Sequence, residues 1–246
     1  VSQEIISNHQ LIEEFKNSKK YYPKLLDLEA KNNEKLKNYN LAFEKINLRN
    51  NILLQLDENK KYDKNKVLDT IKKYKKFFIK SNLKSINTNL TYVDDAKLVF
   101  LVGFPRSGTT LLDTILRTHS KIKVLEEKPY LLNLRHDYFK KNNNNLLSLK
   151  NLDQQNKDYI RNEYYKKIIS NDKDKNKIII DKFPLSIIEI GFIKCIFPEA
   201  KIIFALRNPY DVVISCFFSS FKINDAMINF LDWNDTITFY NEVLDL

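Results

Sequence analysis

Glycine is scarce in this chain, which has only three, at positions 103, 108 and 191 of its 246 residues. Cysteine is scarcer still: Cys195 and Cys216 lie in apolar, helix-like surroundings, with no Cys-x-x-Cys pair or histidine cluster nearby. These absences exclude a disulfide framework and a cysteine-based metal site. They predict two buried free thiols and a reducing compartment.

Long apolar runs are also missing. No stretch reaches the roughly 18 apolar residues that a membrane-spanning helix needs, and no signal-peptide pattern is visible. We therefore expect a cytoplasmic protein with no membrane span.

Acidic residues are in the minority, with 31 Asp and Glu against 41 Lys and Arg, for a formal charge of +10. This excess suits an anionic ligand, although nucleic acid or an acidic membrane surface would attract it as well. The lysines are scattered among Asn, Asp and Glu residues, as on a solvated helix surface, so we expect no nucleic-acid partner. Arginine is rare, and Arg106, Arg117 and Arg207 lie in or beside motifs.

Two of the three glycines lie in one loop. The apolar run 97–102 reads as a buried strand, the loop from Gly103 to Gly108 follows, and an amphipathic helix comes next. Such a loop aims backbone N–H groups at one point at a helix N-terminus, where an anion is favoured. The spacing is that of a P-loop, but Thr109 stands where its Lys would be, and Arg106 supplies a cation inside the loop. The alternative to an anion-binding loop is a tight turn that needs glycine only for packing.

The chain divides by pattern into three parts. Residues 1–57 predict helices, residues 58–96 a further helix and a linker, and residues 97–246 strands that alternate with helices. The alternation predicts an α/β fold, a P-loop-type parallel sheet flanked by helices, with ligands at the carboxyl ends of the strands. The candidate strands are 97–102, 177–181 and 201–206. Within the first part, residues 38–47 resemble the second helix of a tetratricopeptide repeat, although a single copy is equally consistent with an ordinary helical hairpin.

Three more motifs follow apolar runs. Glu126-Glu127 could supply a general base, or could be a solvated acidic pair. Lys182, in Asp181-Lys182-Phe183-Pro184, could stabilise charge on a leaving phosphate oxygen, or could be a surface lysine. Arg207 ends a strand before Pro209 opens a helix, and Ser215 lies just over two turns later, so both could bind one anion. The alternative for Arg207 is a salt bridge that caps the strand.

Together these motifs imply a ligand with two separated phosphates, and they resemble a known family. The segment from Pro105 to Leu112 looks like the 5′-phosphosulfate loop of sulfotransferases, and the segment 207–215 resembles their 3′-phosphate segment. The other motifs match the tyrosylprotein and tetratricopeptide-linked branch of that family. The resemblance covers roughly residues 97–225. It implies 3′-phosphoadenosine-5′-phosphosulfate (PAPS) as cosubstrate, with no obligatory metal ion, and an N-terminal segment that is tetratricopeptide-like.

The resemblance also implies roles for single residues. Glu127 matches the catalytic base, and Arg106 and Lys182 match the groups that bind and neutralise the 5′-phosphosulfate. The resemblance implies sulfuryl transfer to an acceptor hydroxyl on a protein, sugar or lipid, with possible peptide or protein contact through the N-terminal helices. The residues implied in nucleotide binding are Arg106, Ser107, Gly108, Thr109, Thr110, Arg207 and Ser215.

Two other functions stay open. One is a nucleotide kinase or NTPase, which the Thr at position 109 disfavours. The other is a non-catalytic helical binding module with a remnant sulfotransferase domain. His119 is a minor alternative base, since the small-molecule sulfotransferases use a histidine. Family members usually continue beyond the equivalent of Leu246, so we expect a domain that is truncated at its C-terminus, with an open nucleotide site.

Overall fold

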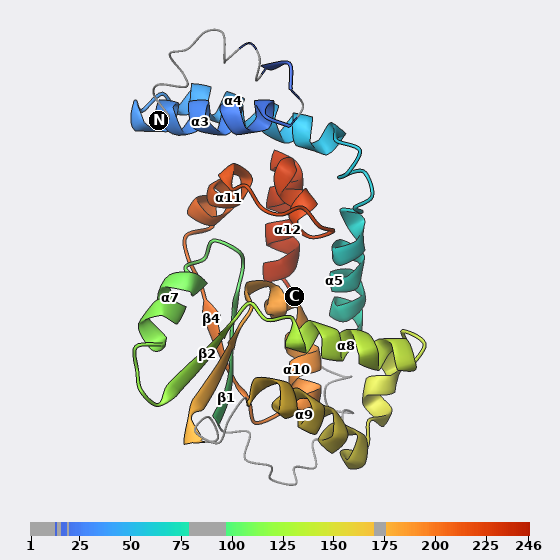
Figure 1. The fold of residues 1–246 in the computed structure, drawn as a ribbon. Helices are drawn as coiled ribbons and strands as arrows, with labels where there is room; N and C mark the ends of the chain where they lie inside the picture. The colour runs from blue at the N-terminus through green and yellow to red at the C-terminus, as the bar shows by residue number, and fades with distance from the viewer. Residues whose placement is uncertain (1–12, 14–15, 19, 79–96, 170–175) are drawn as a thin grey trace. The chain divides into compact units, whose positions relative to one another are not determined.

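The computed structural model describes residues 13, 16–18, 20–78, 97–169 and 176–246, and Figure 1 shows their fold. The chain forms two compact units. The first takes the described residues of Val1–Thr70 together with Val213–Glu242, and the second those of Ile71–Val212 together with Val243–Leu246. In the described part of the chain, no helix is long and apolar enough to cross a membrane.

Two helices lead the first unit. α3 (Tyr22–Lys35) and α4 (Tyr39–Gln55) pack side by side across a short turn. Pro23 lies in the first turn of α3, where its missing N–H has no helical partner to lose. The predicted helical character of this segment is confirmed. Its tetratricopeptide-like arrangement stays a prediction.

The core of the first unit is aromatic. Phe217 stacks on Phe43 with ring centroids 5.2 Å apart, and Trp233 meets the Phe43 ring edge-on at 5.5 Å. Arg49 is buried beside them, where it pairs with Asp27 and donates to the carbonyl oxygens of Phe217 and Phe218, both at 3.1 Å. These carbonyls end α11 (Pro209–Phe218), where a cation is favoured by the helix dipole.

The second unit contains a parallel sheet of four strands in the order β2-β3-β1-β4. The predicted parallel α/β sheet is confirmed, and three of its strands were expected. The second strand in the chain was not, because it is a short edge strand with most of its residues only half buried, and so it lacks a continuous apolar run. The strands are β1 (Leu98–Gly103), β2 (Ile122–Glu126), β3 (Ile178–Lys182) and β4 (Lys201–Ala205).

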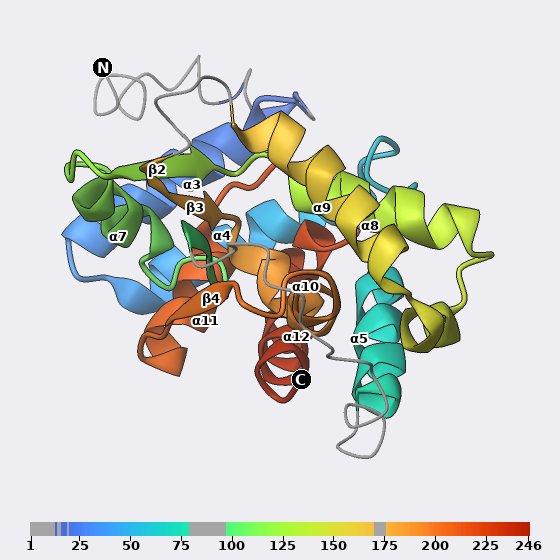
Figure 2. The ribbon, with the colours of Figure 1, turned by 90° about the horizontal axis from the view of Figure 1, so that it is seen from below.

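The two faces of this sheet have different cover, as Figure 2 shows. Val99 and Leu101 of β1 pack toward α7 (Thr109–Leu116) on one face. Phe100, which points the opposite way, contacts Tyr164 of α9 (Gln154–Ile168) and Phe197. This alternation follows from the two-residue period of a strand. Both faces are therefore buried, as parallel sheets require.

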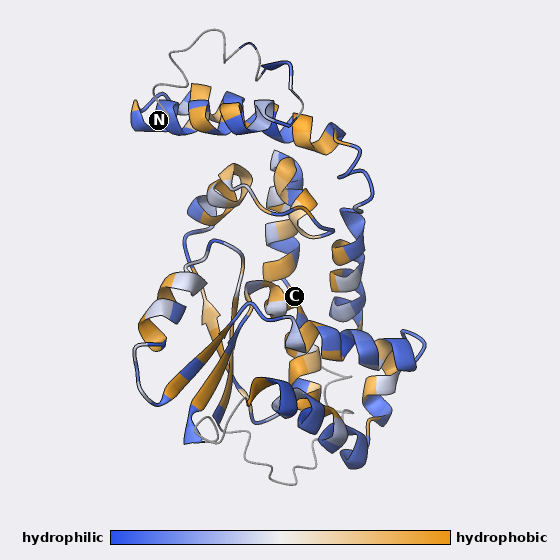
Figure 3. Cartoon of the chain, viewed as in Figure 1, coloured by the Kyte–Doolittle hydropathy of each residue, from blue (hydrophilic) through white to orange (hydrophobic). Residues whose placement is uncertain are grey.

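Hydrophobic residues concentrate in the strands, whereas α8 (Tyr130–Lys141) and α9 contain many hydrophilic residues (Figure 3). α5 (Asn65–Phe77) buries Ile71, Tyr74 and Phe77. Tyr74 donates to Glu189 Oε2 at 2.9 Å, and Arg135 contacts the same carboxylate. The remaining elements are η2 (Leu146–Asn151), η4 (Pro184–Glu189), α10 (Ile190–Ile196), η5 (Met227–Leu231) and α12 (Trp233–Leu244).

Candidate active site

The loop between β1 and α7 has an unusual backbone. Gly108 caps α7 in the left-handed region with φ 95°, and Arg106 has φ 69° although it is not a glycine. Left-handed backbone costs a residue with a side chain of the order of 1–2 kcal/mol, and such strain is concentrated at functional sites. The strained loop therefore marks this end of the sheet as a candidate site.

The start of the loop is closely packed. A Cβ on Gly103 would lie 2.7 Å from the Ala205 carbonyl oxygen and 2.7 Å from Ser107 Oγ. Ser107 is buried, and its Oγ has no hydrogen-bond partner in the structure described. A buried hydroxyl without a partner is costly. A bound anion would satisfy it, at a helix N-terminus that favours negative charge.

Lys182 and Glu127 lie in contact at the neighbouring strand ends. Lys182 ends β3, and its Nζ donates to Glu127 Oε1 at 2.8 Å. The Glu127 backbone N–H donates to the Lys182 carbonyl oxygen, also at 2.8 Å, and Glu127 has a left-handed φ of 49°. Two hydrogen bonds thus fix the position of Glu127 at the end of β2.

Two charged residues that were given no role in the sequence complete this cluster. Asp113 of α7 is fully buried, 3.8 Å from Lys182 Nζ, and it pairs with Arg117 one turn later. Arg117 also donates to Glu126 Oε2 at 2.9 Å, and this hydrogen bond, together with the charge of Lys182, lowers the pKa of Glu126. In the sequence, the i,i+4 spacing of Asp113 and Arg117 was the one indication that these two residues form an ion pair on a helix.

This network distinguishes the two adjacent glutamates. Glu126 is held by Arg117 and also lies 3.5 Å from Lys182. Glu127 contacts Lys182, and its side chain is 54% exposed. Of the two glutamates, Glu127 is the one that has no arginine partner among the residues that the structure describes. Its carboxylate is therefore the one open to an incoming hydroxyl.

Asp181 belongs to the other face of the sheet, although it is adjacent to Lys182. Its Oδ2 accepts a hydrogen bond from the Tyr164 hydroxyl at 2.5 Å, and Oδ1 is buried with no partner within the described structure. Burial raises the pKa of Asp181 to about 6. Because successive strand residues point to opposite faces, Asp181 cannot share a ligand with Lys182.

Arg207 lies beside the loop. Its guanidinium donates to the Arg106 carbonyl oxygen at 3.4 Å and contacts Asp211 Oδ2 at 3.3 Å. The structure therefore brings the 207 segment to the 103–108 loop, as expected from parallel strands β1 and β4. Ser215 lies on α11, half-buried, within the first unit, and its part in binding stays a prediction.

Other titratable groups lie apart from this cluster. His119 follows α7, is exposed, and accepts a hydrogen bond from the Lys121 backbone N–H at 3.2 Å. Cys195 and Cys216 are both buried, and neither forms a disulfide in the described part of the chain. No cluster of His, Cys, Asp or Glu that could hold a metal ion occurs among the residues described.

Comparison with known proteins decides the family. The model of the sulfotransferase family matches residues 98–244, from the first residue of β1 to the last of α12. The chain belongs to the sulfotransferase family. The resemblance drawn from the motifs is confirmed, including the tyrosylprotein sulfotransferase-like branch.

Relatives of this sulfotransferase-family chain are distant. Protein-tyrosine sulfotransferase 1 of Mus musculus is 25% identical over 163 residues, which are 65% of this chain and 44% of that protein. Protein-tyrosine sulfotransferase A of Caenorhabditis elegans is 26% identical over 164 residues, 63% of this chain and 43% of that protein. An uncharacterized protein of Aquifex aeolicus is 26% identical over 147 residues, 54% of this chain and 18% of that protein. The chain thus spans less than half the length of these relatives.

Proposed function

We propose that this chain binds PAPS and transfers its sulfuryl group to an acceptor hydroxyl. The observation that carries the proposal is the 2.8 Å contact between Lys182 Nζ and Glu127 Oε1, beside a loop that suits an anion. Transfer to a hydroxyl needs both of these charges. The cation stabilises the leaving phosphate, and the carboxylate accepts the proton of the hydroxyl.

The loop residues fit the sulfated end of PAPS. Arg106 and the segment from Ser107 to Thr110 would bind the 5′-phosphosulfate, with the buried Ser107 hydroxyl as one donor. Arg207 and Ser215 would bind the 3′-phosphate, because a guanidinium forms paired hydrogen bonds to phosphate oxygens. PAPS supplies a sulfuryl group attached to a phosphate leaving group.

The residues of this chain then have distinct tasks. Glu127 takes the proton from the acceptor hydroxyl as its oxygen bonds to sulfur and the bond from sulfur to the phosphate oxygen breaks. Arg106 and Lys182 stabilise the negative charge that develops. Lys182 is fully buried and contacts the carboxylates of Glu127 and Asp113, which hold its ammonium group at the end of β3.

The acceptor, partners and location are part of the same proposal. The names of the relatives make a protein tyrosine hydroxyl the first acceptor to assay, with sugar and lipid hydroxyls next. The N-terminal helices α3 and α4 would offer a surface for peptide or protein contact. The two buried cysteines, which form no disulfide in the described structure, support a cytoplasmic location.

The rival kinase function is tested by a calorimetric titration with two nucleotides. We expect 3′,5′-ADP to bind without magnesium and about tenfold or more tightly than ATP with magnesium, because Arg207 gives a charged, bidentate partner to a 3′-phosphate. Thr109 offers no cation to β- and γ-phosphates. Magnesium-dependent binding of ATP in preference to 3′,5′-ADP would instead assign the loop to a kinase or NTPase.

A further inference from the structure

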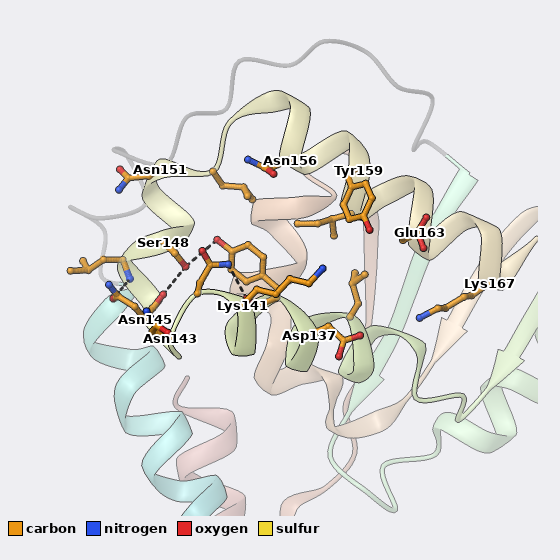
Figure 4. Close-up of a pocket in the computed structure, with 16 residues that line it drawn as sticks. Asp137, Lys141, Asn143, Asn145, Ser148, Asn151, Asn156, Tyr159, Glu163 and Lys167 are labelled. Atoms are coloured by element: carbon orange, nitrogen blue, oxygen red, sulfur yellow. Dashed lines mark hydrogen bonds between the residues drawn. The ribbon is translucent and has the colours of Figure 1, made fainter.

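A pocket lies between α8 and α9, and none of the candidate active-site residues lines it. Its volume is about 590 Å³, which is within the usual range for small-ligand sites. Figure 4 shows polar side chains from α8, η2 and α9 gathered around it. Neither the motifs nor the proposed sulfuryl transfer uses this pocket.

The pocket combines an apolar floor with an amide-rich rim. Leu134, Leu152 and Ile160 are buried. The rim carries the exposed side chains of Asn143, Asn151 and Asn156. None of these three amides makes a side-chain hydrogen bond to another residue in the described part of the chain. Each amide therefore keeps two donors and an acceptor available to a ligand.

The opposite wall of the pocket is already ordered. The Tyr138 hydroxyl donates to Ser148 Oγ at 3.0 Å, and Ser148 Oγ donates to the Asn145 carbonyl oxygen at 2.6 Å. Asn142 Nδ2 donates to the Tyr138 carbonyl oxygen at 2.8 Å. These bonds fix the η2 wall, so that a ligand would not have to order it on binding.

An aromatic ring completes the lining. Tyr159 of α9 lines the pocket, and its side chain is 57% exposed. Lys141 Nζ lies 5.8 Å from the centre of the ring. An exposed ring at a pocket offers an apolar platform with a polar hydroxyl tip.

The charges of the lining cancel. Asp137 and Glu163 are opposed by Lys141 and Lys167, whereas the whole chain has a formal charge of +10. Two acidic and two basic side chains give no net field to attract a strongly anionic ligand. The lining thus favours a neutral ligand with many hydrogen-bonding groups.

We propose that this pocket binds a neutral, hydroxyl-rich ligand of the carbohydrate class. A sugar hydroxyl both donates and accepts, which matches the free amides of Asn143, Asn151 and Asn156. A sugar ring also has an apolar C–H face that packs against an aromatic ring, here Tyr159. The inference rests on the pocket itself and does not depend on PAPS binding.

The test is ligand-observed NMR and calorimetry with neutral tetrasaccharides of glucose, galactose, mannose and N-acetylglucosamine at physiological salt. We expect at least one to bind at millimolar concentration or below. Tyr159→Ala should weaken that binding about tenfold and Asn156→Ala several-fold, through lost stacking and lost hydrogen bonds. Both changes are at exposed positions, so the fold should be kept, and 3′,5′-ADP affinity serves as the check.

The matched control is Tyr39→Ala, which removes a tyrosine that is 62% exposed on α4 and should leave sugar binding unchanged. The proposal is overturned if none of the four tetrasaccharides binds. It is also overturned if Tyr159→Ala and Tyr39→Ala bind the sugar equally well. If the unaltered chain binds a tetrasaccharide but not 3′,5′-ADP, the proposed sulfuryl transfer is contradicted and the assignment of this pocket to a carbohydrate stands.

Discussion

Replacing Glu127 with Gln is expected to lower sulfuryl transfer by roughly 10²–10⁴-fold in a transfer-competent chain, the scale of general-base catalysis. Gln cannot take a proton from the acceptor hydroxyl. Its amide oxygen can still accept the hydrogen bond that Lys182 Nζ gives to Glu127, so nucleotide affinity should change little. The measurement is turnover of radiolabelled PAPS, with 3′,5′-ADP affinity determined in parallel.

The adjacent glutamate is the control for this prediction. Glu126 is held by Arg117 as well as by Lys182, so Glu126→Gln should reduce turnover far less. If Glu126→Gln is the damaging change and Glu127→Gln is silent, the base has been assigned to the wrong residue of the pair.

Asp181→Asn is expected to change the pH dependence of stability. The folded-state pKa of Asp181 is raised to about 6 from its ordinary value of 3.8, so the folded chain binds this proton more tightly than the unfolded chain does. The wild type must therefore lose stability as the pH rises from about 4 to about 6, by about 3 kcal/mol for a shift of this size. Because Asn cannot ionise, the Asp181→Asn variant should not lose stability in this way as the pH rises.

The readout is the difference in unfolding free energy between the two proteins, from chemical denaturation at several pH values. We expect the difference to be small near pH 4 and to grow to about 3 kcal/mol in favour of Asp181→Asn by pH 7. Asn can still accept the hydrogen bond from Tyr164. Asp137→Asn, at an exposed carboxylate of α8, is the control and should show little change. A difference that does not vary with pH would show that Asp181 is not a costly buried charge.

The position of the candidate site in the fold could be predicted in part from the sequence. Loops that follow parallel strands meet at one edge of the sheet, so the placement of Arg106, Lys182 and Arg207 at strand ends followed from the strand pattern. Glu127 follows β2, which was not expected. The opposite facing of Asp181 and Lys182 follows from the strand period alone. Knowing that Lys182 is fully buried required the structure.

Other features depended on tertiary contacts. The edge strand β2 is half buried, so its short apolar run predicted nothing definite. Asp113 reads as a polar position on an amphipathic helix, and only packing against β3 makes it a buried partner of Lys182. The left-handed backbone of Arg106 and Glu127 has no signature in residue type, because neither is a glycine. Such departures from local preference are expected at functional sites.

The central claim is that this site recognises a nucleotide with a phosphate at each end of its ribose. The most direct test is calorimetric titration of the chain and of Arg207→Ala with 3′,5′-ADP and with 5′-AMP. Lys201→Ala, which removes an exposed cation at the far end of β4, is the control. We predict that the chain and Lys201→Ala prefer 3′,5′-ADP by about tenfold or more, and that Arg207→Ala loses the preference. Equal affinity of the unaltered chain for the two nucleotides would contradict the account.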